Sequence, residues 1–296
     1  MAHADDRPAP ARMIDLGPTG HLLIDVDGGL AIHHESEEIL ALERIQPFPA
    51  SVAMVAHHGA HAVFVWLDYD LLIGRMAHLD LNSPLQQGVD RSTVRTAQGI
   101  EDAPHPAGAI WSHVLDAEPV ALSADEQGVL FVLSGRGIYG MTWDGVERFR
   151  HPIPKDDGQI ISVAPVPTGY RAISNSGAWW LVGPDGGIDE QGNLDPDQVL
   201  LGVYEHPIGG ILVHSVSQVL WFDHRMEPMA NISTNGPLRD AQWDDDVGWR
   251  VTGWRQDLLL SVDGVEMANR RDLGIAVNNG KVLTNLGQWT PFLDGS

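Results

Sequence analysis

Residues 128–145 read GVLFVLSGRGIYGMTWDG, and the same pattern returns further along the chain with different letters. A Gly opens the stretch, a short apolar run follows, and a polar turn leads into a second apolar run that ends in Asp-Gly. The run Leu130–Leu133 is apolar at every position, which is typical of a β-strand buried on both faces. The stretch therefore predicts two adjacent antiparallel strands joined by tight turns.

Six further segments share this pattern to different degrees. Four follow it closely, at residues 169–186, 210–224, 248–264 and 280–295. The second turn of the five close copies carries Asp144, Asp185, Asp223, Asp263 and Asp294, at successive spacings of 41, 38, 40 and 31 residues. Two earlier segments, 20–36 and 60–76, keep the paired runs but lack the Asp-Gly turn. The chain therefore contains seven repeats of about 40 residues.

A repeat of this length, with four strands in each unit, resembles the β-propeller superfold. The resemblance covers roughly residues 12–296. It implies an all-β single β-propeller, with seven four-stranded blades as the leading expectation and six or eight as alternatives. Residues 1–11 are expected to be a mobile N-terminal tail, and about residues 80–108 form an insertion between the second and third repeats. The last repeat ends in its third strand.

Two Trp-Asp dipeptides are similar to the dipeptide of the WD-repeat family. They are Trp143-Asp144 and Trp243-Asp244, and they stand at different places in the repeat. No Gly-His pair lies at the matching distance from either. The sequence therefore departs from that family, and no specific propeller family is assigned.

The composition excludes several classes of function. The chain has 40 acidic and 18 basic residues, a formal net charge of −22, and no Cys. A field this negative disfavours nucleic acid and anionic membranes, and it suits a protein partner with a basic surface. The absence of Cys excludes thiolate metal sites and cysteine nucleophiles. The N-terminal residues contain no apolar signal segment and no run could span a membrane, so a cytoplasmic location is expected.

The insertion at about residues 80–108 is the clearest departure from the repeat. Loops of this length are usually functional or disordered. It carries Arg91 and Arg95, which could contact a partner or ligand. An ordered lid or partner-binding arm and a floppy loop are both open interpretations. Residues 111–115 follow it and are expected to be an outer strand, which would place the insertion inside the second blade.

The histidine cluster His57-His58-Gly59-Ala60-His61 is the second departure. It is expected on the loop that joins the first two strands of the second repeat. Imidazoles that converge with carboxylates can hold a divalent metal ion, so His57, His58 and His61 are candidate ligands. The alternative is that they are solvated loop residues and that the protein carries no cofactor.

Turns at one end of the repeats carry residue types that anchor protein interfaces. The turn after the second strand is expected to hold Trp254 and Arg255 in the sixth repeat and Arg136 in the third. The corresponding turn of the second repeat carries Asp68, Tyr69 and Asp70. Carboxylates and aromatic rings together would also suit a sugar.

No catalytic motif occurs in the chain: it has no G-x-S-x-G elbow, no H-E-x-x-H and no Walker loop. The leading hypothesis is therefore a non-enzymatic scaffold or binding protein that engages a protein partner, as part of an assembly. The alternatives are a hydrolase or lyase that acts on a sugar or small molecule in the axial funnel, and a carbohydrate or small-ligand binder without turnover. The enzyme hypothesis requires at least two titratable groups with displaced pKa values at one end of the channel.

Overall fold

The computed structural model describes residues 9–34, 38–68, 73–89, 105–155 and 158–293. The chain divides into two compact units. The larger unit comprises residues 14–173 and 179–192, and the smaller unit comprises residues 1–13, 174–178 and 193–296. No helix within the described ranges is long and apolar enough to cross a membrane.

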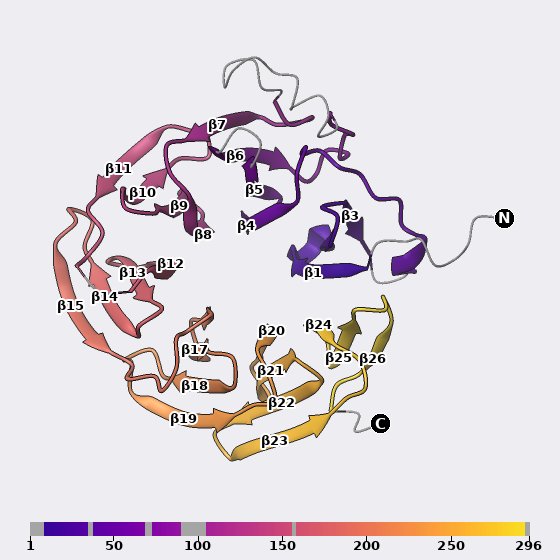
Figure 1. Ribbon diagram of the computed structural model, residues 1–296, viewed down its shortest axis with the longest axis vertical. Helices are drawn as coiled ribbons and strands as arrows, with labels where there is room; N and C mark the ends of the chain where they lie inside the picture. The colour runs from indigo at the N-terminus through magenta and orange to yellow at the C-terminus, as the bar shows by residue number, and fades with distance from the viewer. Residues whose placement is uncertain (1–8, 35–37, 69–72, 90–104, 156–157, 294–296) are drawn as a thin grey trace. The chain divides into compact units, whose positions relative to one another are not determined.

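In the described part of the chain, 26 β-strands form seven sheets, and the strands of each sheet follow one another in the sequence (Figure 1). We name the strands of each sheet A to D in chain order. The first sheet has three strands, β1 (Pro10–Asp15), β2 (His21–Asp25) and β3 (Leu30–His33). The second has β4 (Val52–His58), β5 (His61–Asp68), β6 (Ile73–Asp80) and β7 (Trp111–Leu115). The third has β8 (Pro119–Asp125), β9 (Gly128–Leu133), β10 (Gly137–Met141) and β11 (Glu147–His151).

The remaining four sheets repeat this plan. The fourth has β12 (Ile160–Val166), β13 (Gly169–Ser174), β14 (Ala178–Val182) and β15 (Ile188–Asn193). The fifth has β16 (Gly202–His206), β17 (Gly210–His214), β18 (Gln218–Phe222) and β19 (Pro228–Ser233). The sixth has β20 (Leu238–Asp244), β21 (Gly248–Gly253), β22 (Gln256–Ser261) and β23 (Gly264–Asn269). The seventh has three strands, β24 (Gly274–Asn278), β25 (Lys281–Thr284) and β26 (Trp289–Pro291). Two short 3-10 helices, η1 (Gly17–Thr19) and η2 (Ile39–Ala41), flank β2 and β3.

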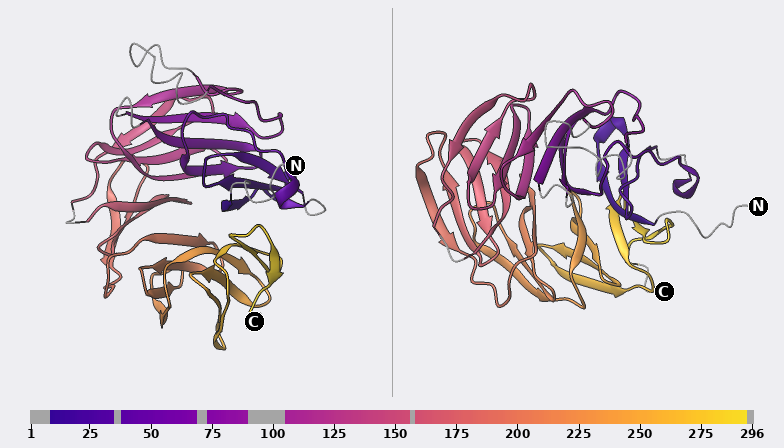
Figure 2. Two further views of the ribbon diagram at one scale, coloured as in Figure 1. Left: turned by 45° about the vertical axis from the view of Figure 1, so that its right-hand side comes forward. Right: turned by 45° about the horizontal axis from the view of Figure 1, so that its top comes forward.

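These seven sheets are the blades of a seven-bladed β-propeller, so the predicted fold class and blade count are confirmed. The apolar runs of the sequence form strands B and C of the sheets, which are the most buried strands. Strands β9, β17 and β18 are buried at every position. The outer strands β15 and β23 are almost entirely exposed; β15 is mostly polar, whereas β23 exposes Val265 and Met267. Figure 2 shows the strong twist within individual sheets, as expected for L-residues.

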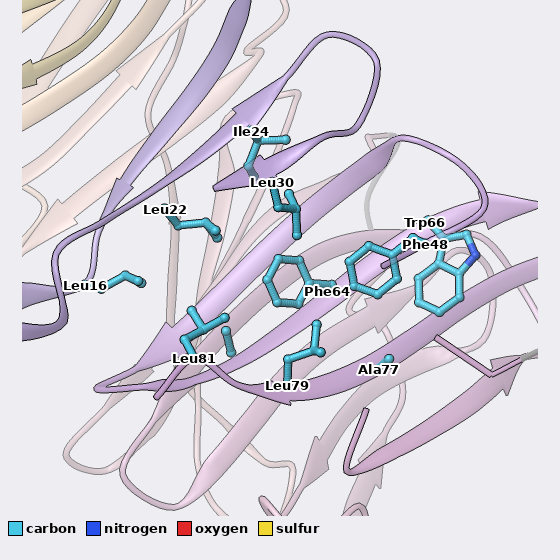
Figure 3. Close-up of a cluster of buried hydrophobic side chains, with 11 residues drawn as sticks. Leu16, Leu22, Ile24, Leu30, Phe48, Phe64, Trp66, Ala77, Leu79 and Leu81 are labelled. Carbon is cyan, nitrogen blue, oxygen red and sulfur yellow. The ribbon is translucent and has the colours of Figure 1, made fainter. Parts of the chain in front are cut away.

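Side chains from neighbouring sheets form the cores. In the larger unit, Phe64 and Trp66 of β5 are fully buried and Phe48 packs against both (Figure 3). Leu22 and Leu30 of the first sheet belong to the same cluster. In the smaller unit, Trp221 and Trp249 each donate an indole hydrogen bond of 2.7 Å to the carbonyl oxygen of Gly209. Each large buried side chain contributes about 1.5–3 kcal/mol by leaving water.

The Asp-Gly turns at Asp144, Asp185 and Asp263 lie between strands C and D, as the repeat predicted, and Asp294 lies outside the described residues. Gly186 has a φ of +84°, a left-handed conformation that residues with a Cβ rarely adopt. The fifth repeat has no Gly after Asp223 and reaches the same reversal with Met226 at a φ of +66°. The Asp223 carboxylate compensates by accepting hydrogen bonds from the backbone N–H groups of Arg225 and Glu227.

The structure also locates the predicted boundaries. Strand β1 begins at Pro10, two residues before the predicted start of the propeller, and residues 1–8 lie outside the described part. Strand β7 pairs with β6 along Gly74–His78, so residues 111–115 form an outer strand as predicted. The insertion therefore lies within the second blade, between strands C and D, and residues 90–104 of it are not described.

Candidate interaction surface

The strands of a propeller blade alternate in direction, so one end of each sheet carries its B–C turn and the loop that leads from strand D to the next strand A. We call this end of the smaller unit the B–C face. Its members are the loops 194–201, 234–237 and 270–273 and the turns 215–217, 254–255 and 285–288.

Hydrogen bonds join these loops and turns into one continuous surface. Each bond connects a loop to a neighbouring turn, either through the backbone or through a side chain. The bonds are Gln198 Nε2 to Ser217 Oγ (2.9 Å), Thr234 N to Ser217 O (2.9 Å), Trp254 N to Pro237 O (3.2 Å), Arg270 N to Arg255 O (2.9 Å) and Asn285 N to Leu273 O (3.0 Å). Because every neighbouring pair is bonded, the face can present side chains in fixed positions.

Large apolar side chains are exposed on the B–C face. They come from one loop and from the B–C turns of all three sheets: Val199, Leu201, Val216, Trp254 and Leu286. Trp254 is the largest, and 46% of it is exposed. The opposite end of the same unit exposes Ile208 (68%) and Val262 (81%), and no aromatic residue among the large exposed apolar side chains described there. Exposed aromatic residues among aliphatic ones are typical of interfaces.

Trp254 owes its position to a glycine in the adjoining loop. A Cβ on Gly236 would lie 2.5 Å from Cβ of Trp254 and 2.7 Å from its Cγ. Real Cβ atoms do not approach other carbons so closely, so only Gly lets the indole side chain lie over loop 234–237. The backbone bond from Trp254 to Pro237 fixes the turn against the same loop.

Three exposed arginines share this face with Trp254, in a protein that has few basic residues. Arg239, Arg255 and Arg271 are exposed at this end of the sixth and seventh sheets. Arg255 has a φ of +52°, a left-handed conformation that costs about 1–2 kcal/mol for a residue with a Cβ. Strain of this kind is concentrated at functional sites, because the surrounding structure must stabilise it.

A buried ion pair supports the face from beneath. Arg270 donates from Nη2 to Oδ2 of Asp257 at 2.6 Å and from Nε to Oδ1 at 2.9 Å, and both side chains are nearly inaccessible to solvent. Thr252 donates its hydroxyl to the same carboxylate at 2.7 Å. Arg270 also donates to Thr290 Oγ1 and to the carbonyl oxygen of Pro291. The pair therefore ties loop 270–273 to strands β21, β22 and β26.

The structure brings together only part of the predicted site. Trp254 and Arg255 form the B–C turn of the sixth sheet, as predicted. Arg136 is in the B–C turn of the third sheet in the larger unit, where it pairs weakly with exposed Asp116 at 3.9 Å and lines a cavity of 570 Å³. Asp68 ends strand β5. The other four candidates lie outside the described residues: Tyr69, Asp70, Arg91 and Arg95.

The histidine cluster flanks the A–B turn of the second sheet, but its histidines lie in strands and not in the loop. His57 and His58 are the last residues of β4 and point to opposite faces. His61 instead approaches His78, with 3.1 Å between Nδ1 and Nε2, and both rings contact Trp143. Burial lowers the pKa of the His78 imidazole, and the neighbouring His61 lowers it further. In the described ranges no three His, Asp or Glu side chains come together as metal ligands would.

A second group of titratable residues lies on the A strands of the smaller unit. Asp240 of β20 accepts a hydrogen bond of 2.8 Å from the backbone N–H of Val277. Burial raises the pKa of Asp240 to about 7, with Arg12 acting in the opposite direction. Burial also raises the pKa of Tyr204, which interacts with the charges of Asp240 and Arg12. A carboxyl group with a pKa near neutrality can exchange protons at physiological pH.

Sequence reasoning missed most of the apolar residues on the face. Val216 lies in the B–C turn one repeat before that of Trp254, and Leu286 in the turn one repeat after it, so aligning the B–C turns would have revealed them. Val199 and Leu201 carried no such signal, because they lie in a D–A loop, and the D–A loops differ in length from repeat to repeat.

Comparisons with known proteins agree with the fold. No family model matches the chain, and no curated protein matches its sequence. The solved WD40 β-propeller domain of Doa1 superposes with a TM-score of 0.64 and 9% identity, covering 97% of this chain and 91% of that one. The β-propeller domain of Cps50 (Swd1) from Myceliophteria thermophila gives a TM-score of 0.64 and 7% identity, covering 94% and 92%. The chain thus has the fold of seven-bladed propellers, and the likeness shows the fold alone.

Proposed function

We propose that this protein is a non-enzymatic scaffold that binds a protein partner through the B–C face of the smaller unit, as part of a cytoplasmic assembly. The observation that carries the proposal is exposed Trp254, held against Gly236 on a face that also exposes Val216, Leu286 and three arginines. Trp and Arg are the residue types most enriched among those that dominate binding energy at interfaces. A hydrogen-bonded surface loses little conformational entropy when it binds, which favours affinity.

The charges indicate what kind of partner fits. The net charge of −22 attracts a basic protein over long distances and raises its association rate at low salt. At the surface itself, Arg255 and Arg271 favour contact with carboxylates or aromatic rings of the partner. The proposed partner therefore has a basic surface overall and places apolar or acidic side chains against Trp254.

Affinity purification from native cell extract tests the proposal. The bait proteins are the wild type, Trp254→Ala and Val262→Ala, at low and high salt, with mass spectrometry of the co-eluting proteins. Val262 is the matched control because it is more exposed than Trp254 and lies at the opposite end of its sheet. We expect a stoichiometric partner with the wild type and with Val262→Ala that is lost with Trp254→Ala. Equal recovery with all three baits would contradict the proposal.

A second candidate function rests on Asp240, Tyr204 and Arg12. A carboxyl group with a pKa of about 7 beside a phenol and a guanidinium could act as a general acid or base on a sugar or small molecule. Screening glycosides and small esters with the wild type and Asp240→Asn tests this candidate. Turnover that Asp240→Asn abolishes would favour an enzyme, and absence of turnover across the screen would count against it.

A further inference from the structure

The first sheet, whose strands β2 and β3 lie in the larger unit, lacks the fourth strand that five of the seven sheets possess. Its last strand, β3, is therefore an edge strand. Residues after η2 cover only one end of this edge, where Leu30 and Ile45 exchange two backbone hydrogen bonds of 2.7 and 2.9 Å. No further strand of the described chain pairs with β3.

The register of β3 shows which backbone groups face this position. Since Leu30 bonds outward to Ile45, its N–H and C=O groups point away from β2. The backbone N–H and C=O groups of alternate residues in a strand point to the same side. Those of Ile32 therefore also point away from β2. No hydrogen bond joins the backbone of Ile32 to any other described residue on that side. An unpaired donor and acceptor on an exposed edge are a template for another strand.

A groove of 540 Å³ runs along this part of the edge. Its lining mixes polar groups with apolar side chains, among them Leu42, Ile45, Leu81 and Leu85. Two of its lining residues, Leu30 and Leu81, belong to the buried cluster drawn in Figure 3. A groove of this volume is within the range of protein binding sites. Apolar side chains beside an unpaired strand edge suit alternate apolar side chains of an extended peptide, and the polar groups of the lining suit the peptide backbone.

The charge of the groove narrows the choice of peptide. Glu43 is the only carboxylate or basic side chain among its lining residues, which otherwise contribute one histidine and uncharged groups. A peptide with acidic residues would face Glu43 and the −22 charge of the whole chain. Neutral or basic residues between the apolar ones avoid this repulsion.

We propose that the edge of β3 is a second binding site, independent of the B–C face, at which an extended segment of a partner protein adds as the fourth strand of the first sheet. The segment carries apolar residues at alternate positions and no acidic residues in the groove. Its backbone pairs with the outward N–H and C=O of Ile32, and its apolar side chains fill the groove between Leu42 and Leu85.

Selection from a displayed library of random twelve-residue peptides tests this proposal on the full-length protein. Affinities of the selected peptides, made synthetically, are then measured by fluorescence anisotropy. Ile32→Pro removes the outward N–H and leaves the pairing with β2, because Pro is tolerated on an edge strand where the N–H faces outward. Ile32→Val is the matched control, since it keeps the N–H with a similar side chain.

We expect the selected peptides to alternate apolar and non-acidic residues. Their affinity should fall at least tenfold for Ile32→Pro and stay within twofold for Ile32→Val and Trp254→Ala. N-methylation at alternate peptide positions should abolish binding, a readout that does not depend on how well Ile32→Pro folds. Failure to select any peptide, or binding unaffected by both Ile32→Pro and N-methylation, would overturn the proposal. Self-association of the protein that Ile32→Pro abolishes would also overturn it, by assigning the edge to a second copy.

Discussion

Arg270 and Asp257 form a two-point ion pair, with donor–acceptor distances of 2.6 and 2.9 Å, and only 5% and 1% of their side chains are exposed. The pair connects the loop before the seventh sheet to the strand that follows Trp254. It therefore sets the position of the B–C face relative to the core of the sixth sheet. A buried charge that loses its partner is strongly destabilising, so this pair can be tested directly.

Asp257→Asn should lower the free energy of unfolding by about 3–5 kcal/mol, because it leaves the guanidinium of Arg270 buried without a carboxylate. Chemical denaturation measures the change. Glu147→Gln is the control, since Glu147 pairs with Arg150 at 3.2 Å on the surface. An exposed pair of this kind contributes about 0–1 kcal/mol. A similar small loss for Asp257→Asn would show that the buried pair does not hold the face.

Arg255→Gly should separate stability from binding. Gly adopts a φ of +52° without strain, so we expect the free energy of unfolding to stay the same or to rise by up to about 1 kcal/mol. Binding of the partner should weaken, because the guanidinium is lost. Thermal unfolding and titration calorimetry measure the two effects. A clear loss of stability would mean that the Arg255 side chain has a structural role.

His214 should make the protein less stable in acid. Burial lowers the pKa of His214 from 6.5 to about 4, so the unfolded state binds a proton more readily than the folded state. The free energy of unfolding should therefore fall by roughly 3 kcal/mol as the pH decreases from 6.5 to 4. His214→Phe removes this contribution, and urea unfolding at several pH values should show a shallower slope. If the pH dependence of stability were the same in His214→Phe as in the wild type, His214 would not be the source of the acid sensitivity.

Asp240 should make the protein less stable as the pH rises, which is opposite to the effect of His214, over an overlapping pH range. Its pKa rises from 3.8 to about 7, so the folded state holds the proton more tightly than the unfolded state. The free energy of unfolding should fall by roughly 4 kcal/mol as the pH increases from 4 to 7. Asn keeps an oxygen that can accept from Val277, so Asp240→Asn should be more stable than the wild type at pH 8. Equal stability at pH 8 would show that Asp240 ionises normally.

The repeat predicted the fold well because its signal is local. Buried B and C strands such as Gly128–Leu133 are continuous apolar runs, and the C–D turns carry Asp and Gly for conformational reasons. The surface could be predicted only in part. Trp254 stands out by residue type alone, whereas the approach of His61 to His78 depends on strand register over 17 residues. Gly236 gave no signal, since its role appears only when the neighbouring turn is in place.

The most direct test of the B–C face is the dissociation constant of the purified partner for three proteins: the wild type, Trp254→Ala and Val262→Ala. The partner is the protein recovered with wild-type bait, and each variant is first shown to unfold within 1 °C of the wild type. We expect Trp254→Ala to bind at least tenfold more weakly, because losing a central aromatic anchor costs at least about 1.4 kcal/mol of binding free energy. Val262→Ala should bind as tightly as the wild type. Equal affinity of the wild type and Trp254→Ala would place the partner elsewhere on the protein.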